Sequence, residues 1–324
     1  MLIKLWIYGI LCASCIIAEI SANKQAIQTK TPRKKQRINS RFSRDFPDPH
    51  YPKAYKFFQE SNVNETEDSN EIPDDMDTKI INGRPATEGE FPWMVALHFN
   101  DRFICSSFLI SPTLVMTAAH CVKFENGVEP ATAFYGIIGN IRREGPETRI
   151  QFLEVVAHPE YGTGAECDIA LLRLSSPVEM NERIQQICIP QAGSSFDLVY
   201  IKAMGWGVTS NDAEQSPETL MVTDLSVTPR ALCVFFYGLL GITITDKHIC
   251  ANSFKPTGVC YGDSGGPAVF EDTISGKPVA VGVASFISFL GCGRPLAPSV
   301  YTRIASYIDW ITETVGENSD ICFV

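Results

Sequence analysis

A series of short apolar segments separated by turn-forming residues most constrains the fold of this chain. Each segment is short enough to be a single strand, and many short strands between turns are typical of β-sandwiches and β-barrels. A hydrophobic content of 45% is ample for a packed core. The sequence therefore predicts an all-β fold. The segments are Met94–His98, Phe103–Ile110, Leu114–Ala118, Arg149–Ala157, Asp168–Leu174, Leu220–Val227 and Pro278–Phe286.

The segment Gly262–Pro267 reads GDSGGP and places Ser264 among glycines. Glycines let the backbone turn tightly beside a substrate, and they leave N–H groups free to face a developing oxyanion. A serine hydroxyl is a weak nucleophile, so it needs a base, and the base needs an orienting group. The sequence TAAHC contains a candidate base, His120, and the sequence DIALL begins with a candidate orienting group, Asp168.

These three motifs occur in the order His, Asp, Ser. Because it contains all three motifs in this order, the chain resembles the chymotrypsin-like (trypsin-fold) secreted serine endopeptidases. The resemblance covers Ile80 to about Trp310. The resemblance implies two six-stranded antiparallel β-barrels with the active site in the cleft between them. It implies that His120 and Asp168 come from the first barrel and Ser264 from the second.

The hydrophobic period changes near the C-terminus. Ile304, Tyr307, Ile308 and Ile311 recur at the spacing of one helix face. We therefore expect a closing amphipathic α-helix packed on the second barrel, with residues 317–324 as a tail.

The resemblance also implies a role for each residue of the site. His120 takes the proton of Ser264 and returns it to the leaving amine. Asp168 is a buried carboxylate that needs a hydrogen-bonding partner, and His120 is the obvious one. Read alone, Asp168 is a residue at the start of a strand. The N–H groups of Gly262 and Ser264 form the oxyanion hole, and Ser285 hydrogen-bonds the aspartate and borders the cleft.

Three residues at positions that line the family's substrate pocket predict its specificity. Gly258, six residues before Ser264, lies at the base of the pocket, where an aspartate would be needed to repay the burial of a Lys or Arg side chain. Ile287 and Ser299 form its walls, and the β-branched Ile287 fills the space that an aromatic side chain would need. The pattern resembles elastases and predicts cleavage after small aliphatic residues.

The N-terminal region resembles a signal peptide followed by a propeptide. Lys4, an apolar run and small residues up to Ala22 predict a signal peptide over 1–22 and a secreted, extracellular protein. Residues 23–44 carry eight Lys or Arg and no acid, and residues 60–78 carry eight Asp or Glu and no base. Such charge blocks predict a largely disordered propeptide over 23–79. Asn64 begins an N-glycosylation sequon within it.

The junction before Ile80 resembles the family's activation site. Cleavage after Lys79 exposes the α-amino group of Ile80, and in the family this ammonium pairs with the aspartate before the nucleophile, here Asp263. The catalytic domain would then cover residues 80–324.

Eleven cysteines fit an oxidising compartment, and Cys12 and Cys15 lie in the expected signal peptide. Spacing alone does not fix the pairing of the other nine. The resemblance implies the disulfides Cys105–Cys121, Cys233–Cys250 and Cys260–Cys292.

Three cysteines, Cys167, Cys188 and Cys322, are left over. Two of them can pair, with Cys322 in the C-terminal tail reaching either of the others, and the third thiol then stays free or joins chains. A further disulfide of the family is absent, because Ile201 and Phe270 stand where its cysteines are expected.

The remaining features limit cofactors and partners. After the expected signal peptide, which contains Cys12 and Cys15, no Cys-x-x-Cys or His-x-x-x-His spacing is present, which disfavours zinc, and we expect no required metal and no cofactor. A net charge of −11 from Ile80 onward argues against a nucleic-acid partner, and no later stretch reaches the length of a membrane span. The expected partners are a protein or peptide substrate, an activating protease specific for basic residues and a macromolecular protease inhibitor.

Two other functions were weighed against an active endopeptidase. A catalytically silent homologue, acting as a binding partner or cascade cofactor, commonly lacks the serine or histidine, whereas this chain keeps the whole triad. An α/β-class ester hydrolase is disfavoured, because the order of the three residues differs from that class and the chain is rich in β-strands.

Overall fold

The computed structural model describes residues 83–145, 149–162, 165–208, 215–253, 257–288, 290–294, 297–316 and 320–324. The predicted signal peptide, the propeptide with Asn64, and the junction of Lys79 and Ile80 lie outside the described residues. Across the ranges given above, no helix is both long enough and apolar enough to cross a membrane.

Six antiparallel strands close into a first barrel in the order β2-β3-β4-β9-β8-β7. They are β2 (Met94–Phe99), β3 (Arg102–Ser111), β4 (Leu114–Thr117), β7 (Phe134–Ile138), β8 (Arg149–Ala157) and β9 (Ala170–Leu174). The apolar run of β3 is buried from Cys105 to Ser111, so this strand forms part of the core. A small hairpin of β5 (Lys123–Phe124) and β6 (Gly127–Val128) follows the His120 segment.

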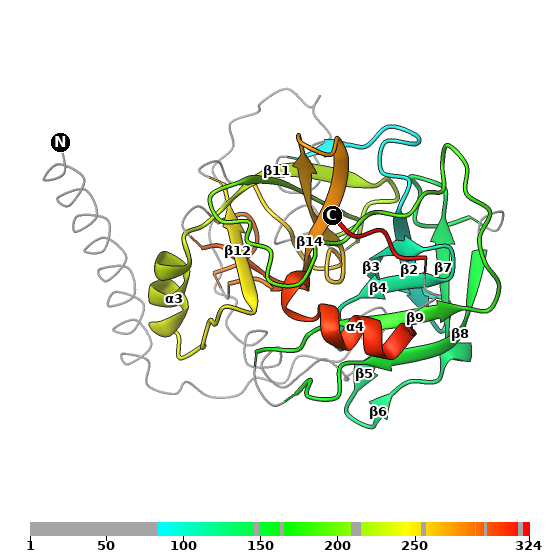
Figure 1. Cartoon of the computed structure of the whole chain (residues 1–324), viewed down its shortest axis with the longest axis horizontal. Helices are drawn as coiled ribbons and strands as arrows, with labels where there is room; N and C mark the ends of the chain where they lie inside the picture. The colour runs from blue at the N-terminus through cyan, green and yellow to red at the C-terminus, as the bar shows by residue number, and fades with distance from the viewer. Residues whose placement is uncertain are drawn as a thin grey trace, which may run out of the picture. The chain divides into compact units, whose positions relative to one another are not determined.

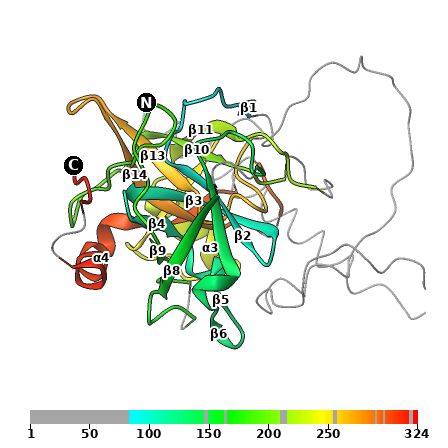
Figure 2. The same cartoon turned by 90° about the vertical axis from the view of Figure 1, so that its right-hand side faces the viewer.

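The second barrel is the larger sheet, in the order β1-β11-β10-β13-β14-β15-β12, which pairing of β11 with β12 closes. Its strands are β1 (Arg84–Pro85), β10 (Tyr200–Gly205), β11 (Met221–Val227), β12 (His248–Asn252), β13 (Pro267–Asp272), β14 (Lys277–Phe286) and β15 (Ser299–Arg303). The strands of the two barrels form separate groups in Figure 1, and Figure 2 shows β10, β11, β13 and β14 together from a second direction. The prediction of an all-β fold with two six-stranded antiparallel barrels and a C-terminal helix is confirmed.

The seven predicted segments correspond to β2, β3, β4, β8, β9, β11 and β14, within about two residues at most ends. The helix α3 (Arg230–Gly238) was not predicted. Its buried residues, Cys233 and Tyr237, are four apart on one face, but apolar Leu232 and Phe235 lie on the exposed part of the helix. A helix without a single apolar face leaves no helical period in the sequence.

The C-terminal helix was predicted correctly in position but only in part in packing. It consists of the 3-10 turn η3 (Ile304–Ser306) followed by α4 (Ile308–Val315). The expectation that it packs on the second barrel holds for η3, which lies against β14, but is wrong for the start of α4. The rings of Tyr307 and Trp310 lie 5.3 and 4.9 Å from the ring of His158, which directly follows β8 of the first barrel. Figure 1 shows α4 beside β9. Helical spacing identifies a buried face but not the surface that buries it.

Four disulfides link the described residues. Three are the pairs that the family resemblance implied, and the fourth joins Cys188 to Cys322 in the tail. The tail runs beside Ile189, whose N–H donates to the Cys322 carbonyl oxygen over 2.9 Å. Where a further family disulfide is missing, Ile201 is buried in the core of the second barrel and Phe270 packs against the same cluster. Both side chains therefore contribute to the apolar core of the second barrel.

Candidate active site

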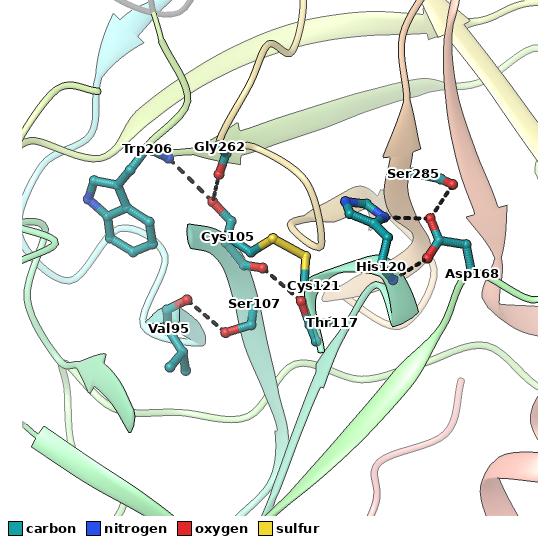
Figure 3. Close-up of a disulfide and its surroundings, with 11 residues drawn as sticks. Val95, Cys105, Ser107, Thr117, His120, Cys121, Asp168, Trp206, Gly262 and Ser285 are labelled. Carbon is teal, nitrogen blue, oxygen red and sulfur yellow. Dashed lines mark hydrogen bonds and ion pairs between the residues drawn. A yellow bond between two sulfur atoms is a disulfide. The ribbon is translucent and has the colours of Figure 1, made fainter. Parts of the chain in front are cut away.

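His120 and Asp168 form the best-defined contact of the site. His120 lies in the 3-10 turn η1 (Ala119–Cys121), directly after β4, and the Cys105–Cys121 disulfide holds this turn against β3. Nδ1 of His120 lies 2.8 Å from Oδ2 of Asp168, and the backbone N–H of His120 donates to Oδ1 over 2.9 Å. An ionised carboxylate only accepts, so Nδ1 carries the proton and Nε2 is left as an acceptor. Figure 3 shows both contacts beside the disulfide.

Asp168 is also held by the second barrel. Ser285 on β14 donates its hydroxyl to Oδ2 over 2.5 Å, and Thr302 on β15 donates its hydroxyl to the Asp168 carbonyl oxygen over 2.8 Å. The Asp168 side chain is 6% exposed. The carboxylate accepts three donors in all, two from His120 and one from Ser285, which compensates the burial of its charge. The contact to Ser285 is the one that the family resemblance implied.

The pair is arranged to keep Asp168 ionised and His120 basic. Burial alone would raise the pKa of Asp168, but the charge and hydrogen bonds of His120 and the hydroxyl of Ser285 lower it below its ordinary value. Burial alone would lower the pKa of His120, but the charge and hydrogen bond of Asp168 outweigh it and raise that pKa.

The loop that carries Ser264 connects β12 to β13. The N–H of Ser106 on β3 donates to the Ser264 carbonyl oxygen over 2.9 Å, and the N–H of Gly265 donates to the Ala284 carbonyl oxygen over 2.8 Å. Gly265 has φ +79, and a Cβ there would overlap with the hydroxyl of Thr117, three residues before His120. The fold therefore brings the Ser264 loop against the segment that leads into His120 on one side and against Ser285 on the other.

The glycine before this serine turns the chain in a way that few other residues allow. Gly262 has φ +97, and its carbonyl oxygen accepts the hydroxyl of Ser106 over 3.0 Å. A Cβ on Gly262 would approach the Cα of Gly207 and the ring of Phe103. Positive φ and crowding both favour glycine here.

Asp263 is buried beside this loop, with 1% of its surface exposed. Its carboxylate accepts the N–H groups of Cys260 and Gly207, each over 2.8 Å. Burial raises the pKa of Asp263 to about 7, although the two backbone hydrogen bonds lower it. Among the described residues, no Lys, Arg or His forms an ion pair with it.

Gly205 and Gly207 make the space for the Asp263 carboxylate. A Cβ at either position would overlap with it. Trp206 between them is fully buried and donates its indole N–H to the Ile141 carbonyl oxygen over 2.8 Å. These glycines and Ser106 were missed by the sequence analysis, because neither a Gly-x-Gly nor a serine after a cysteine is distinctive by itself.

The residues expected to line the substrate pocket are partly brought together. A Cβ on Gly258 would lie 3.3 Å from the Cα of Gly293 and 3.9 Å from the hydroxyl of Ser299, so these three share one small space. The Cys260–Cys292 disulfide closes it on one side. Ile287 is half-buried and packs against the core cluster of the second barrel that contains Tyr301.

Comparison with known proteins agrees with this architecture. The family model described as Trypsin matches residues 80–311. The chain is 34% identical over 255 residues to the clotting factor G beta subunit of Tachypleus tridentatus, covering 74% of this chain and 81% of that protein. It is 33% identical over 244 residues to transmembrane protease serine 9 of Rattus norvegicus, and 32% over 243 residues to transmembrane protease serine 11B of Homo sapiens. Each match covers 74% of this chain, but only 22% and 56% of those two proteins.

Two closed β-barrels with a buried His–Asp pair held between them define a trypsin-like serine protease domain. The chain belongs to the trypsin family.

Proposed function

We propose that the chain is a secreted serine endopeptidase, made as a zymogen and activated by cleavage after Lys79. The observation that carries this proposal is the buried contact of Asp168 with His120, which leaves Nε2 of the imidazole as an acceptor, while Gly265 of the Ser264 loop lies against Thr117, which leads into His120. Membership of the trypsin family supports peptide-bond hydrolysis as the reaction.

In the proposed mechanism, Nε2 of His120 takes the proton of the Ser264 hydroxyl as the oxygen attacks the substrate carbonyl carbon. The N–H groups of Gly262 and Ser264 donate to the oxyanion of the tetrahedral intermediate. His120 then gives its proton to the leaving amine, which leaves an acyl-enzyme that water hydrolyses by the same steps. Asp168 stabilises the imidazolium at each stage.

The state of Asp263 supports activation by a new N-terminus. A fully buried carboxyl whose pKa is raised to about 7 is a favourable place for a cation. In the proposed activation, the α-ammonium of Ile80 enters this site and pairs with Asp263. The ion pair then fixes the turn at Gly262, whose φ of +97 is open to glycine.

The pocket residues support cleavage after small aliphatic side chains. Gly258 brings no charge to the pocket base, so a substrate Lys or Arg would lose its hydration without a partner. Ile287 narrows the pocket from one wall. Ser299, which is 7% exposed, adds only a hydroxyl to the other wall.

The test begins with the secreted chain and its S264A variant, each cleaved by a protease specific for basic residues. N-terminal sequencing should give Ile-Ile-Asn-Gly, and the K79Q variant should resist this cut. A fluorophosphonate probe should label the cleaved parent and leave both S264A and the uncleaved chain unlabelled. Absence of label from correctly cleaved parent protein would overturn the enzymatic proposal and favour a catalytically silent homologue.

The specificity is tested on the labelled, active protein. Peptides with Ala or Val before the scissile bond should be hydrolysed with a higher kcat/KM than matched peptides with Phe or Arg. A preference for Arg would overturn the assignment of the pocket while leaving the triad in place.

A further inference from the structure

Three metal-ligating side chains that the triad does not use meet in the loop between β8 and β9. A ring nitrogen of His158, a carboxylate oxygen of Glu160 and Sγ of Cys167 all lie within 4.8 Å of one another. Among the described cysteines, Cys167 is the one that has no disulfide. The sequence analysis disfavoured zinc because it considered only closely spaced pairs, whereas these ligands follow the spacing His-x-Glu-x-x-x-x-x-x-Cys.

The geometry of the cluster is close to that of a tetrahedral zinc site. With a Zn–S distance of about 2.3 Å and a Zn–O distance of about 2.1 Å, tetrahedral angles place the sulfur and oxygen about 3.6 Å apart. Sγ of Cys167 lies 3.7 Å from Oε2 of Glu160. The other separations lie within 4.8 Å, so binding one ion would draw the three donor atoms closer together.

The chemistry of the three donors selects the metal. A thiolate, an imidazole and a carboxylate are the three side-chain types that bind Zn²⁺, and a site with three protein ligands keeps its fourth position for water. The thiol must lose its proton to bind, and that proton is released to the solvent as the Zn–S bond forms.

Neighbouring side chains already hold the two buried ligands in place. The Trp310 ring lies 4.9 Å from the His158 ring. Nδ1 of His158 accepts the backbone N–H of Glu160 over 3.3 Å, so zinc bound at Nδ1 would replace this hydrogen bond. The hydroxyl of Tyr307 accepts the Cys167 N–H over 2.9 Å and lies 3.8 Å from its sulfur. Hydrogen bonds of this kind orient metal ligands and strengthen binding.

We propose that His158, Glu160 and Cys167 form a Zn²⁺ site that regulates the protease. His158 and Cys167 are buried, and Glu160 is exposed, so the ion enters from the solvent past the glutamate.

The site is joined directly to the triad. Cys167 precedes Asp168, has φ +63, and accepts the Ile169 N–H on its carbonyl oxygen over 2.9 Å. The N–H of His158 donates to the Ile169 carbonyl oxygen over 3.0 Å. Drawing the three ligands onto one ion therefore pulls on the backbone that positions Asp168, and zinc should lower kcat. Zinc binding is independent of the proposed function, whereas this inhibition rests on it.

Binding is tested on the S264A variant of the full chain, so that proteolysis plays no part. Titration calorimetry with Zn²⁺ should show one site per chain that C167S and H158Q remove. E160Q should weaken binding by about tenfold or more, since losing even an outer-shell partner costs that much. Addition of Co²⁺ should give a thiolate-to-cobalt charge-transfer band that is absent in C167S.

Two controls separate a lost ligand from a lost fold. E160Q changes an exposed side chain, and E154Q, which changes an exposed glutamate on β8, should bind Zn²⁺ like the parent. Thermal unfolding of each variant shows that it is folded.

Unchanged zinc binding in folded C167S and E160Q, or the absence of the cobalt–thiolate band in the parent, would overturn the site. Inhibition of the active parent that chelator reverses and C167S lacks would support the coupling. Zinc binding without any change in kcat would overturn the regulatory part alone.

Discussion

Ser285 donates its hydroxyl to the same oxygen of Asp168 that contacts Nδ1 of His120. Ser285 belongs to β14 of the second barrel, and Asp168 directly precedes β9 of the first. One carboxylate oxygen thus joins the two barrels and the imidazole, so the alignment of the barrels and the orientation of the base depend on each other.

Replacing Ser285 with alanine should lower kcat by about tenfold, equivalent to about 1.4 kcal/mol, which is close to the lower end of the range of about 1.5–3 kcal/mol for a hydrogen bond to a charged group. KM should change little if the hydroxyl acts through Asp168. Steady-state kinetics of the cleaved enzyme would measure this, with S226A on β11 as the control. A change in KM with kcat unchanged would instead place Ser285 in substrate binding.

The pH dependence of the cleaved enzyme should follow the raised pKa of His120. The imidazole must be neutral to act as a base, so kcat/KM should fall with decreasing pH through an apparent pKa above the ordinary 6.5. D168N removes the charge that raises this pKa, and kcat should fall by about 10⁴ because the wrong nitrogen then carries the proton. A pH–rate profile of the parent centred below 6.5 would contradict the prediction.

The uncleaved chain should lose stability as pH rises because of Asp263. Between the ordinary pKa of 3.8 and the folded value of about 7, the folded state binds more protons than the unfolded state. The free energy of unfolding therefore falls across this window, by an amount on the order of several kcal/mol relative to D263N.

Thermal unfolding of the uncleaved parent and D263N from pH 4 to pH 8 would measure that difference. In the cleaved protein the Ile80 ammonium should keep Asp263 ionised and remove the effect. Parallel stability curves for the uncleaved parent and D263N would show that the carboxyl is not perturbed.

Replacing Gly265 with alanine should destabilise the domain by at least about 2 kcal/mol, through backbone strain and overlap with Thr117. Gly238, the last residue of α3, offers a matched control, because a Cβ there meets no atom within 4 Å. G238A should change the free energy of unfolding by less than about 1 kcal/mol. Chemical denaturation of both variants gives the comparison, and similar losses would remove the special role of Gly265.

Much of the site could be predicted from sequence because its chemistry is concentrated in three motifs. TAAHC, DIALL and GDSGGP contain the residues that the fold places together, and the alternation of apolar segments and turns predicted most strands. Residues that act from elsewhere in the chain carry no such motif. Ser106 supports both Gly262 and Ser264, yet it is an ordinary strand residue until β3 pairs in the barrel.

The remaining differences have the same origin in long-range packing. The partner of Cys322 was left open between Cys167 and Cys188, and the parallel contact of the tail with Ile189 decides for Cys188. The start of α4 is buried where the rings of Tyr307 and Trp310 pack on His158, directly after β8 of the first barrel. Local periodicity contains neither piece of information.

The Cys188–Cys322 disulfide bears on what the proposed cleavage after Lys79 would release. Both sulfurs belong to the C-terminal piece, and residues 23–79 contain no cysteine at all. A cut after Lys79 therefore leaves no covalent tether, and the two pieces should migrate separately even on a non-reducing gel. Whatever holds the precursor in place through its basic N-terminal segment would keep only that segment, and the enzyme would diffuse away from the point of its activation.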